Sequence, residues 1–92
     1  MDPDDPVKMP IEDVLDLHTF SRRDIPNLLQ DYFDECIAHG IFSVRIIHGK
    51  GKGIQKKQVQ KILQTNPLVA TFKDAPPEAG GWGATLVELK RQ

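Results

Sequence analysis

The chain has few of the residues that build disulfide-bonded or membrane-spanning proteins. Cys36 is its single cysteine, so no disulfide can form within the chain, as is typical of a reducing compartment. No apolar run approaches the ~20 residues that a membrane-spanning helix needs. The first residues, MDPDDPVKMP, are acidic where a signal peptide would be basic and then apolar. These absences predict a cytoplasmic protein with no membrane partner.

Aromatic residues are also scarce, at 7% of a chain of 92 residues, and hydrophobic residues make up 39%. A chain of this length supports one domain with one modest core. Its start combines three prolines with three aspartates and offers almost nothing to bury. We therefore expect a flexible acidic arm at 1–10 and one domain at 11–92, and we expect that domain to be a monomer.

Net charge is close to zero, −1 at pH 7, which predicts weaker and more salt-sensitive binding to nucleic acid than a basic protein would show. Positively and negatively charged residues nevertheless lie in different parts of the chain. Residues 45–61 contain no acid, so a polyanion could sense their cations at short range, within the ~8 Å over which charges act at physiological salt. These cations are Arg45, Lys50, Lys52, Lys56, Lys57 and Lys61. A solvated lysine-rich helix face is the alternative interpretation.

Apolar spacing divides the chain into alternating strands and helices. Segment 21–39 has the i, i+3, i+4, i+7 pattern of an amphipathic helix, with Ser21 and Asp24 resembling a capping box. Segment 53–65 has the same spacing. The lysines expected on the outer face of that second helix are Lys56, Lys57 and Lys61. Strands are predicted at 13–18, 41–47, 68–74 and 84–90.

The resulting order, β-α-β-α-β-β, predicts an α/β fold with a mixed four-stranded sheet. Strand-helix-strand connections are right-handed and leave the strands they join parallel, whereas a final hairpin makes the last strand antiparallel. Open α/β sheets bind ligands beyond the carboxyl ends of their parallel strands. That edge should carry Asp16 and His18, the loop 48–53 and the hairpin loop 75–83.

The loop at 48–53 reads HGKGKG and joins a predicted strand to a predicted helix. It is not a P-loop, since no Gly-Lys pair precedes Ser or Thr, and it is not a dinucleotide fingerprint, since Ile54 replaces the third glycine. What remains is a turn whose backbone N–H groups, helix N-terminus and lysines can hold an anion. A sulfate ion or a nucleic-acid phosphate would both satisfy it.

Three motifs occur in a fixed order: LDLHTF at 15–20, IIHGKGKG at 46–53 and GGWGATLVEL at 80–89. Together they resemble the Smr domain, the small MutS-related module found at the end of MutS2 proteins, and PIEDVLDLHTF resembles its short free-standing bacterial branch. The resemblance implies a two-layer sandwich similar to the C-terminal domain of bacterial translation initiation factor three. It also implies endonuclease activity on RNA or DNA.

By position, the resemblance assigns Asp16 and His18 to a D-x-H motif. It assigns 48–51 to H-G-K-G and 80–85 to G-G-x-G-A-T. The sequence departs from the family pattern at Thr19, where many members have glycine, so the shape of this loop is left open.

Two histidines beside a lysine suit phosphodiester cleavage. We expect His18 and His48 to act as an acid-base pair, Lys50 to stabilise the charged phosphorane, and Asp16 to orient an imidazole. Two-metal nucleases need several acids, and Asp16 is the one well placed at this edge, whereas the positions of Asp74 and Glu78 relative to it are left open. We therefore favour metal-independent chemistry with no cofactor, a divalent metal being the alternative. Such chemistry uses the ribose 2′-OH and therefore favours RNA, including structured or ribosome-associated RNA, over DNA.

The motif edge also supplies residues expected to hold phosphates and bases. A non-catalytic module that binds nucleic acid without cutting it would use the same side chains. Trp82 either stacks on a base or folds over the sheet edge as a hydrophobic plug. The residues expected to bind nucleic acid are Arg22, Arg23, Gly49, Lys50, Gly51, Lys52, Gly53, Lys56, Lys57, Gly80, Gly81, Trp82, Gly83 and Thr85.

Overall fold

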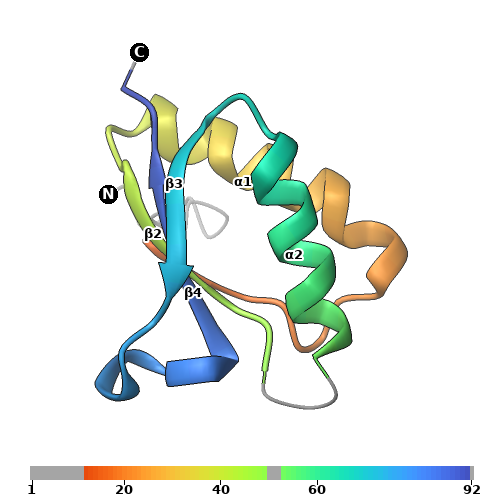
Figure 1. Cartoon of the computed structure of the whole chain (residues 1–92). Helices are drawn as coiled ribbons and strands as arrows, with labels where there is room; N and C mark the ends of the chain where they lie inside the picture. The colour runs from red at the N-terminus through yellow and green to blue at the C-terminus, as the bar shows by residue number, and fades with distance from the viewer. Residues whose placement is uncertain (1–11, 50–52, 92) are drawn as a thin grey trace, which may run out of the picture.

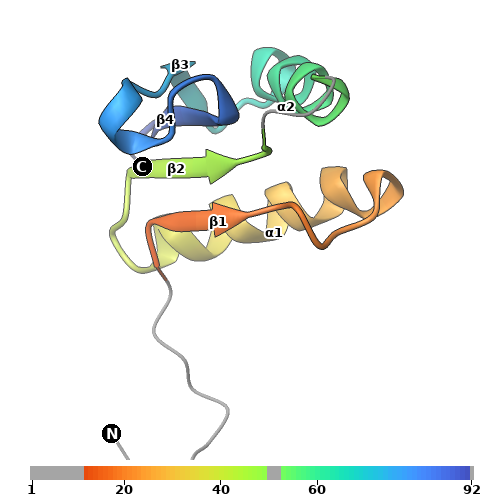
Figure 2. The same ribbon diagram turned by 90° about the horizontal axis from the view of Figure 1, so that it is seen from below.

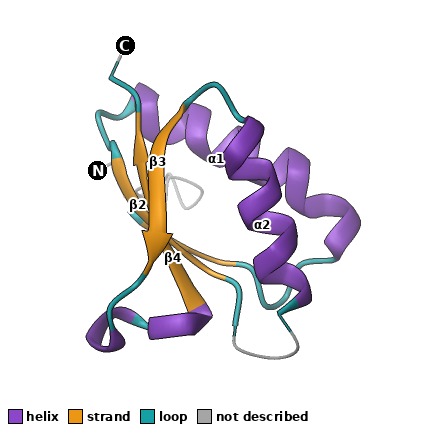
Figure 3. Ribbon diagram, viewed as in Figure 1, coloured by secondary structure: helices purple, strands orange, loops and turns teal. Residues whose placement is uncertain are grey.

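The computed structural model describes residues 12–49 and 53–91, so the arm predicted at 1–10 lies outside the described residues. Strands and helices alternate in the predicted order (Figures 1 and 3). The elements are β1 (Val14–Asp16), α1 (Ile25–Ala38), β2 (Ser43–Ile47), α2 (Ile54–Thr65), β3 (Val69–Asp74) and β4 (Ala84–Leu89). Short 3-10 turns at Arg22–Asp24, Pro77–Ala79 and Gly81–Gly83 complete the connections.

The four strands form one mixed sheet in the order β1-β2-β4-β3. β1 pairs with β2 in parallel, and Figure 2 shows their arrows pointing the same way. β4 lies between β2 and β3 and is antiparallel to both, with an irregularity in β3 between Val69 and Thr71. The predicted fold class is therefore confirmed, including the parallel crossovers and the antiparallel last strand.

Both helices pack on the same side of the sheet, which gives two layers (Figure 1). This is the geometry that two right-handed crossovers in the same direction across a sheet require. Burial alternates along β2, where Val44 and Ile46 face the helices and Ser43 and Arg45 face away. The buried side chains of this layer are Leu17, Ile25, Leu29, Phe33, Cys36, Val44, Ile46, Val59, Leu63, Val69, Val87 and Leu89.

The first helix starts later than its apolar pattern suggested. Residues Arg22–Asp24 form a 3-10 turn, and α1 begins at Ile25 with Pro26 in its first turn, where a missing N–H costs nothing. The predicted capping box is not formed, because neither Ser21 nor Asp24 makes a side-chain cap hydrogen bond. Within the described residues, no helix is long and apolar enough to cross a membrane.

Candidate functional site

The sheet register brings the three sequence motifs to one edge. Asp16 at the end of β1 lies opposite Ile47 at the end of β2, and Ile47 lies opposite Ala84 at the start of β4. On the other side of β4, Asp74 at the end of β3 lies opposite Thr85. We call this side of the molecule the motif edge.

Asp16 and His18 form a contact on the exposed surface of the motif edge. The Nδ1 atom of His18 lies 2.7 Å from Oδ1 of Asp16, and the backbone N–H of His18 donates to the same oxygen at 3.0 Å. These two hydrogen bonds hold the pKa of Asp16 below its usual value. The His18 side chain remains 67% exposed. With a hydrogen on Nδ1, the ring carries none on Nε2, which lies on the side of the ring away from the carboxylate.

His48 lies in different surroundings from those that sequence analysis expected. Its strand ends beside β1 as predicted, but its imidazole is only 4% exposed. Nε2 lies 2.8 Å from Oγ1 of the fully buried Thr85, and Nδ1 lies 3.2 Å from the carbonyl oxygen of Gly49. Burial, reinforced by the charge of Lys56, lowers the pKa of His48 and favours the neutral ring.

Backbone hydrogen bonds join the glycine-rich loop to the hairpin loop. The carbonyl oxygen of Gly83 accepts hydrogen bonds from the N–H groups of His48 (3.1 Å) and Gly49 (3.0 Å). Gly49 has a φ of +82°, which a glycine adopts without strain. The start of the glycine-rich loop is therefore fixed to the end of the hairpin loop.

Gly53 and Trp82 form a second connection between these loops. Gly53 has a φ of +78°, and a Cβ atom at this position would lie 2.9 Å from Cη2 of the Trp82 ring. The absence of a side chain at Gly53 therefore lets the indole pack against the start of α2.

Lys56 does not lie where a phosphate-binding residue was expected. Helical spacing predicts Lys56 on the outer face of the second helix, but the residue is only 6% exposed, so this prediction is wrong. Its Nζ atom lies 3.2 Å from Oδ1 of Asp74 and 4.1 Å from the centroid of the Trp82 ring. Both partners come from segments distant in sequence, so helical spacing could not reveal that Lys56 points inward. In this conformation Lys56 supports the indole and is not presented to a phosphate.

Other cations of the predicted set are exposed near the motif edge. Arg22 and Arg23 lie in the 3-10 turn that follows β1, and Lys57 lies in the first turn of α2. The side-chain amide of Gln58 donates to the carbonyl oxygen of Arg22 at 2.7 Å, which fixes that turn against α2. These three side chains are therefore available to a polyanion at neighbouring positions.

The centre of the glycine-rich loop, with Lys50, Gly51 and Lys52, lies outside the described residues. In residues 12–49 and 53–91, no group of three His, Cys, Asp or Glu side chains is arranged to hold a metal ion.

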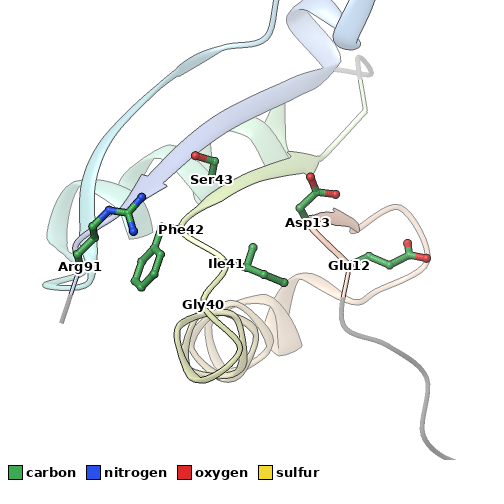
Figure 4. A pocket seen from close by; sticks show the side chains of 7 residues that line it. All are labelled: Glu12, Asp13, Gly40, Ile41, Phe42, Ser43 and Arg91. Atoms are coloured by element: carbon green, nitrogen blue, oxygen red, sulfur yellow. The ribbon is translucent and has the colours of Figure 1, made fainter. Parts of the chain in front are cut away.

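A surface pocket lies at the opposite end of the sheet, where β1 and β2 begin (Figure 4). It contains two carboxylates, Glu12 and Asp13, and the guanidinium of Arg91, which lies 4.7 Å from the ring centroid of Phe42. Two carboxylates suit a polyanion poorly, so the motif edge is the better candidate site.

The sequence left open whether Asp74 lies at the motif edge and did not reveal it as the partner of Lys56. A signal for it existed, because Asp74 ends a strand and its hairpin partner is Thr85, whose alternation with Val87 and Leu89 marks the buried face. To use that signal, one must know which residues of the two hairpin strands pair with each other. The loop at 75–83 prevents this pairing from being predicted from the sequence.

The fold and this edge define a class of small two-layer α/β domain in which histidine- and glycine-bearing loops extend from the ends of parallel strands. The Smr domain model matches residues 15–90, and the chain belongs to the Smr family.

Relatives share this region as part of much longer proteins. The chain is 38% identical over 76 residues to "Endonuclease MutS2" of Staphylococcus carnosus, covering 83% of this chain and 10% of that protein. It is 37% identical over 75 residues to "Endonuclease MutS2" of Helicobacter pylori, covering 82% of this chain and 10% of that protein. The chain thus spans a tenth of the length of these relatives.

Two solved structures share the fold. The Smr domain of Thermus thermophilus MutS2 superposes with a TM-score of 0.79 at 31% identity, covering 84% of this chain and 96% of that one. YdaL, a stand-alone small MutS-related protein from Escherichia coli, gives a TM-score of 0.80 at 28% identity and covers 94% of this chain and 70% of that one.

Proposed function

We propose that this chain is a nucleic-acid endonuclease that favours RNA over DNA. Support comes from its membership of the Smr family and from relatives named as endonucleases. The exposed cations of the motif edge add a physical reason, since Arg22, Arg23 and Lys57 can contact successive phosphates. Lys50 and Lys52 belong to the same proposal through their place in the glycine-rich loop. The proposed substrates are structured RNAs, including ribosome-associated RNA.

The observation that carries the proposal is the contact between Asp16 and His18. A carboxylate that accepts a hydrogen bond from Nδ1–H of a histidine fixes the tautomer and the orientation of the ring and leaves Nε2 free of hydrogen, which is the arrangement a general base needs. The ring is also exposed, so a substrate can reach it. RNA carries its own nucleophile next to each phosphodiester, and one oriented imidazole suffices to take the proton of the 2′-OH.

In the proposed reaction, His18 accepts the proton of the 2′-OH and the 2′-oxygen attacks phosphorus. The bond to the 5′-oxygen breaks, and that oxygen takes a proton from solvent. The products are a 2′,3′-cyclic phosphate and a free 5′-OH. Lys50 stabilises the negative charge that develops on the phosphorane oxygens.

His48 takes a different role from the one its motif first suggested. Both of its ring nitrogens have protein partners and the ring is buried, so we assign the proton transfer to His18. His48 instead holds the glycine-rich loop against β4 through Thr85. It is a positioning residue in this proposal.

The test incubates purified protein with end-labelled structured RNA and with supercoiled plasmid, in EDTA or in magnesium. We expect RNA cleavage in EDTA with 2′,3′-cyclic phosphate ends. His18→Ala should lower the rate about 10²- to 10⁴-fold, the usual contribution of general acid-base catalysis. His39→Ala is the matched control, because His39 is an exposed histidine in the connection that leads into the start of β2. Magnesium-dependent nicking of plasmid without RNA cleavage would contradict this mechanism.

A non-catalytic binding module is the second candidate, and the burial of His48 favours it. An acid-base pair needs two accessible groups, whereas a phosphate grip needs only the cations and backbone N–H groups of the motif edge. Retention of RNA by the wild-type protein and by His18→Ala, with no cleavage by either, would establish this alternative.

A further inference from the structure

The exposed large hydrophobic side chains of the described residues share one location. They are Phe20, Ile54 and Trp82. Phe20 follows the end of β1, Ile54 opens α2, and Trp82 precedes β4, so all three flank the motif edge. Apolar surface that gathers beside cations on an otherwise polar domain marks a binding surface rather than a packing defect.

Trp82 is the best defined of these side chains. The Nζ atom of Lys56 lies 4.1 Å from its ring centroid on one face, and Cη2 packs against Gly53. The charge of Lys56 is itself fixed by Asp74 at 3.2 Å. Yet Trp82 stays 47% exposed, which a hydrophobic plug over the sheet edge would not. Lys56 and Gly53 therefore hold the indole in place, while part of its surface stays accessible to a partner.

A partner that uses both the indole and the cations must combine a flat apolar face with negative charge. Arg22, Arg23 and Lys57 supply positive charge on the turn and helix that flank the same edge. An unpaired nucleotide has both features, since its base stacks and its phosphate pairs. In a duplex, each base face is already covered by its neighbours, so an indole gains nothing without disrupting the stack.

We propose that Trp82 is a base-stacking platform and that the nucleic acid enters the motif edge as a single strand or an unpaired loop. Because Lys56 occupies one face of the indole, the base stacks on the opposite face. This inference rests on the proposed function for the presence of nucleic acid, and it names the class of strand that the site accepts.

Trp82 is the single tryptophan of the chain, so intrinsic fluorescence reports on it alone. The experiment titrates the protein, at low salt, with a fluorescein-labelled single strand of 2′-O-methyl RNA, which lacks the nucleophilic 2′-OH and stays intact, and with the same strand as a blunt duplex. A single strand with abasic sites at every position serves as a ligand of matched length and charge. Anisotropy of the label measures binding, and indole emission measures stacking.

We expect saturable quenching of Trp82 by the single strand, with the same midpoint as the anisotropy curve, and much less quenching by the abasic strand and the duplex. Trp82→Ala should weaken binding of the single strand about 5- to 100-fold. Trp82→Phe, which keeps an aromatic face, should restore most of that loss. Lys57→Gln is the charge control and should weaken single strand and duplex alike.

The outcomes separate the two proposals. Binding of the single strand with unchanged Trp82 emission and unchanged affinity in Trp82→Ala would overturn the stacking platform while leaving the proposed function standing. Equal affinity for the duplex and the single strand would also overturn it. Failure of every strand to bind would overturn both. Circular dichroism of each variant checks that the fold is retained.

Discussion

The Nε2 atom of His48 lies 2.8 Å from the Oγ1 atom of Thr85, and both side chains are buried. The contact joins the residue that opens the glycine-rich loop to the second residue of β4. Since Gly83 also accepts hydrogen bonds from the backbone of residues 48 and 49, side chain and main chain hold the two loops together at the same place. The shape of the motif edge therefore depends on a hydrogen bond inside the core.

Replacing Thr85 by valine should destabilise the domain by about 1–3 kcal/mol, because a buried imidazole nitrogen loses its partner and gains no water. Ser43→Ala is the matched control. Its hydroxyl donates to Glu88 at 2.7 Å on the exposed face, where water can replace the bond, so the loss should stay within about 0.5 kcal/mol. Urea unfolding measures both free energies. Equal effects of the two substitutions would contradict a special role for the buried contact.

The lowered pKa of His48 makes stability depend on pH. In the unfolded chain His48 takes up a proton near pH 6.5, whereas the folded protein resists protonation until a lower pH. As pH falls below that unfolded value, the unfolded state binds more protons and is favoured. The contribution of His48 to stability is therefore fully present above pH 6.5 and is lost as pH falls toward the folded pKa.

The measurement compares the pH dependence of the unfolding free energy of wild type and His48→Gln between about pH 5 and 7.5. Glutamine does not titrate, so the difference between the two profiles isolates the proton of His48. We expect the stability of wild type to fall more steeply on the acid side. Parallel profiles would show that His48 titrates alike in both states. The carboxyl of Asp16, whose pKa is also lowered, titrates below this range.

The sequence carried enough information to predict the fold, because hydrophobic periodicity and connection rules act locally. The apolar, β-branched run at 41–47 predicted the strand in which Val44 and Ile46 alternate on the buried side, and the parallel ends of β1 and β2 followed from a right-handed crossover. The same alternation continues to His48, whose position matches the buried parity of the strand. That signal is present in the sequence, but the HGKGKG motif groups His48 with the glycines and lysines of the loop at 48–53.

The inward direction of Lys56 could not be predicted in this way. A lysine in an amphipathic helix normally stays in water, and only a nearby charge and aromatic ring make its burial favourable. Asp74 and Trp82 supply these from the end of β3 and the hairpin loop. Asp74 and Trp82 lie beside α2 only because of the three-dimensional packing, which no local sequence pattern encodes.

The ion pair between buried Lys56 and exposed Asp74 gives a prediction that separates neighbouring lysines of α2. Lys56→Met should destabilise the domain by about 1–3 kcal/mol, less than a fully buried pair, because Asp74 is partly exposed and water can still reach it. Lys57→Met changes an exposed side chain one position along, so its stability should stay within about 0.5 kcal/mol of wild type.

For nucleic-acid binding, Lys57→Met should have the larger effect and Lys56→Met the smaller, which is the reverse of their effects on stability. The measurement is affinity as a function of salt concentration. Lys57→Met should weaken binding and reduce the salt dependence by about one charge, because the proposed function uses the exposed Lys57 as a phosphate contact. Lys56→Met, studied at a temperature where it stays folded, should keep the salt dependence of wild type. A reduced salt slope for Lys56→Met would restore Lys56 to the phosphate-binding set.

Gly49 and Gly53, which are left-handed glycines in the described part of the loop, separate backbone strain from crowding by Trp82. Gly49 and Gly53 have nearly equal φ values of +82° and +78°, so alanine at either position should pay about 1–2 kcal/mol of backbone strain. A Cβ atom at Gly49 meets nothing within 4 Å, whereas one at Gly53 lies 2.9 Å from the Trp82 ring. Gly53→Ala should therefore cost more than Gly49→Ala in urea unfolding. It should also shift the emission of Trp82, because the indole must move, while Gly49→Ala should leave that emission unchanged.

Equal costs and equal spectra would mean that Trp82 does not rest on Gly53 in solution, and the support for a fixed indole would be lost.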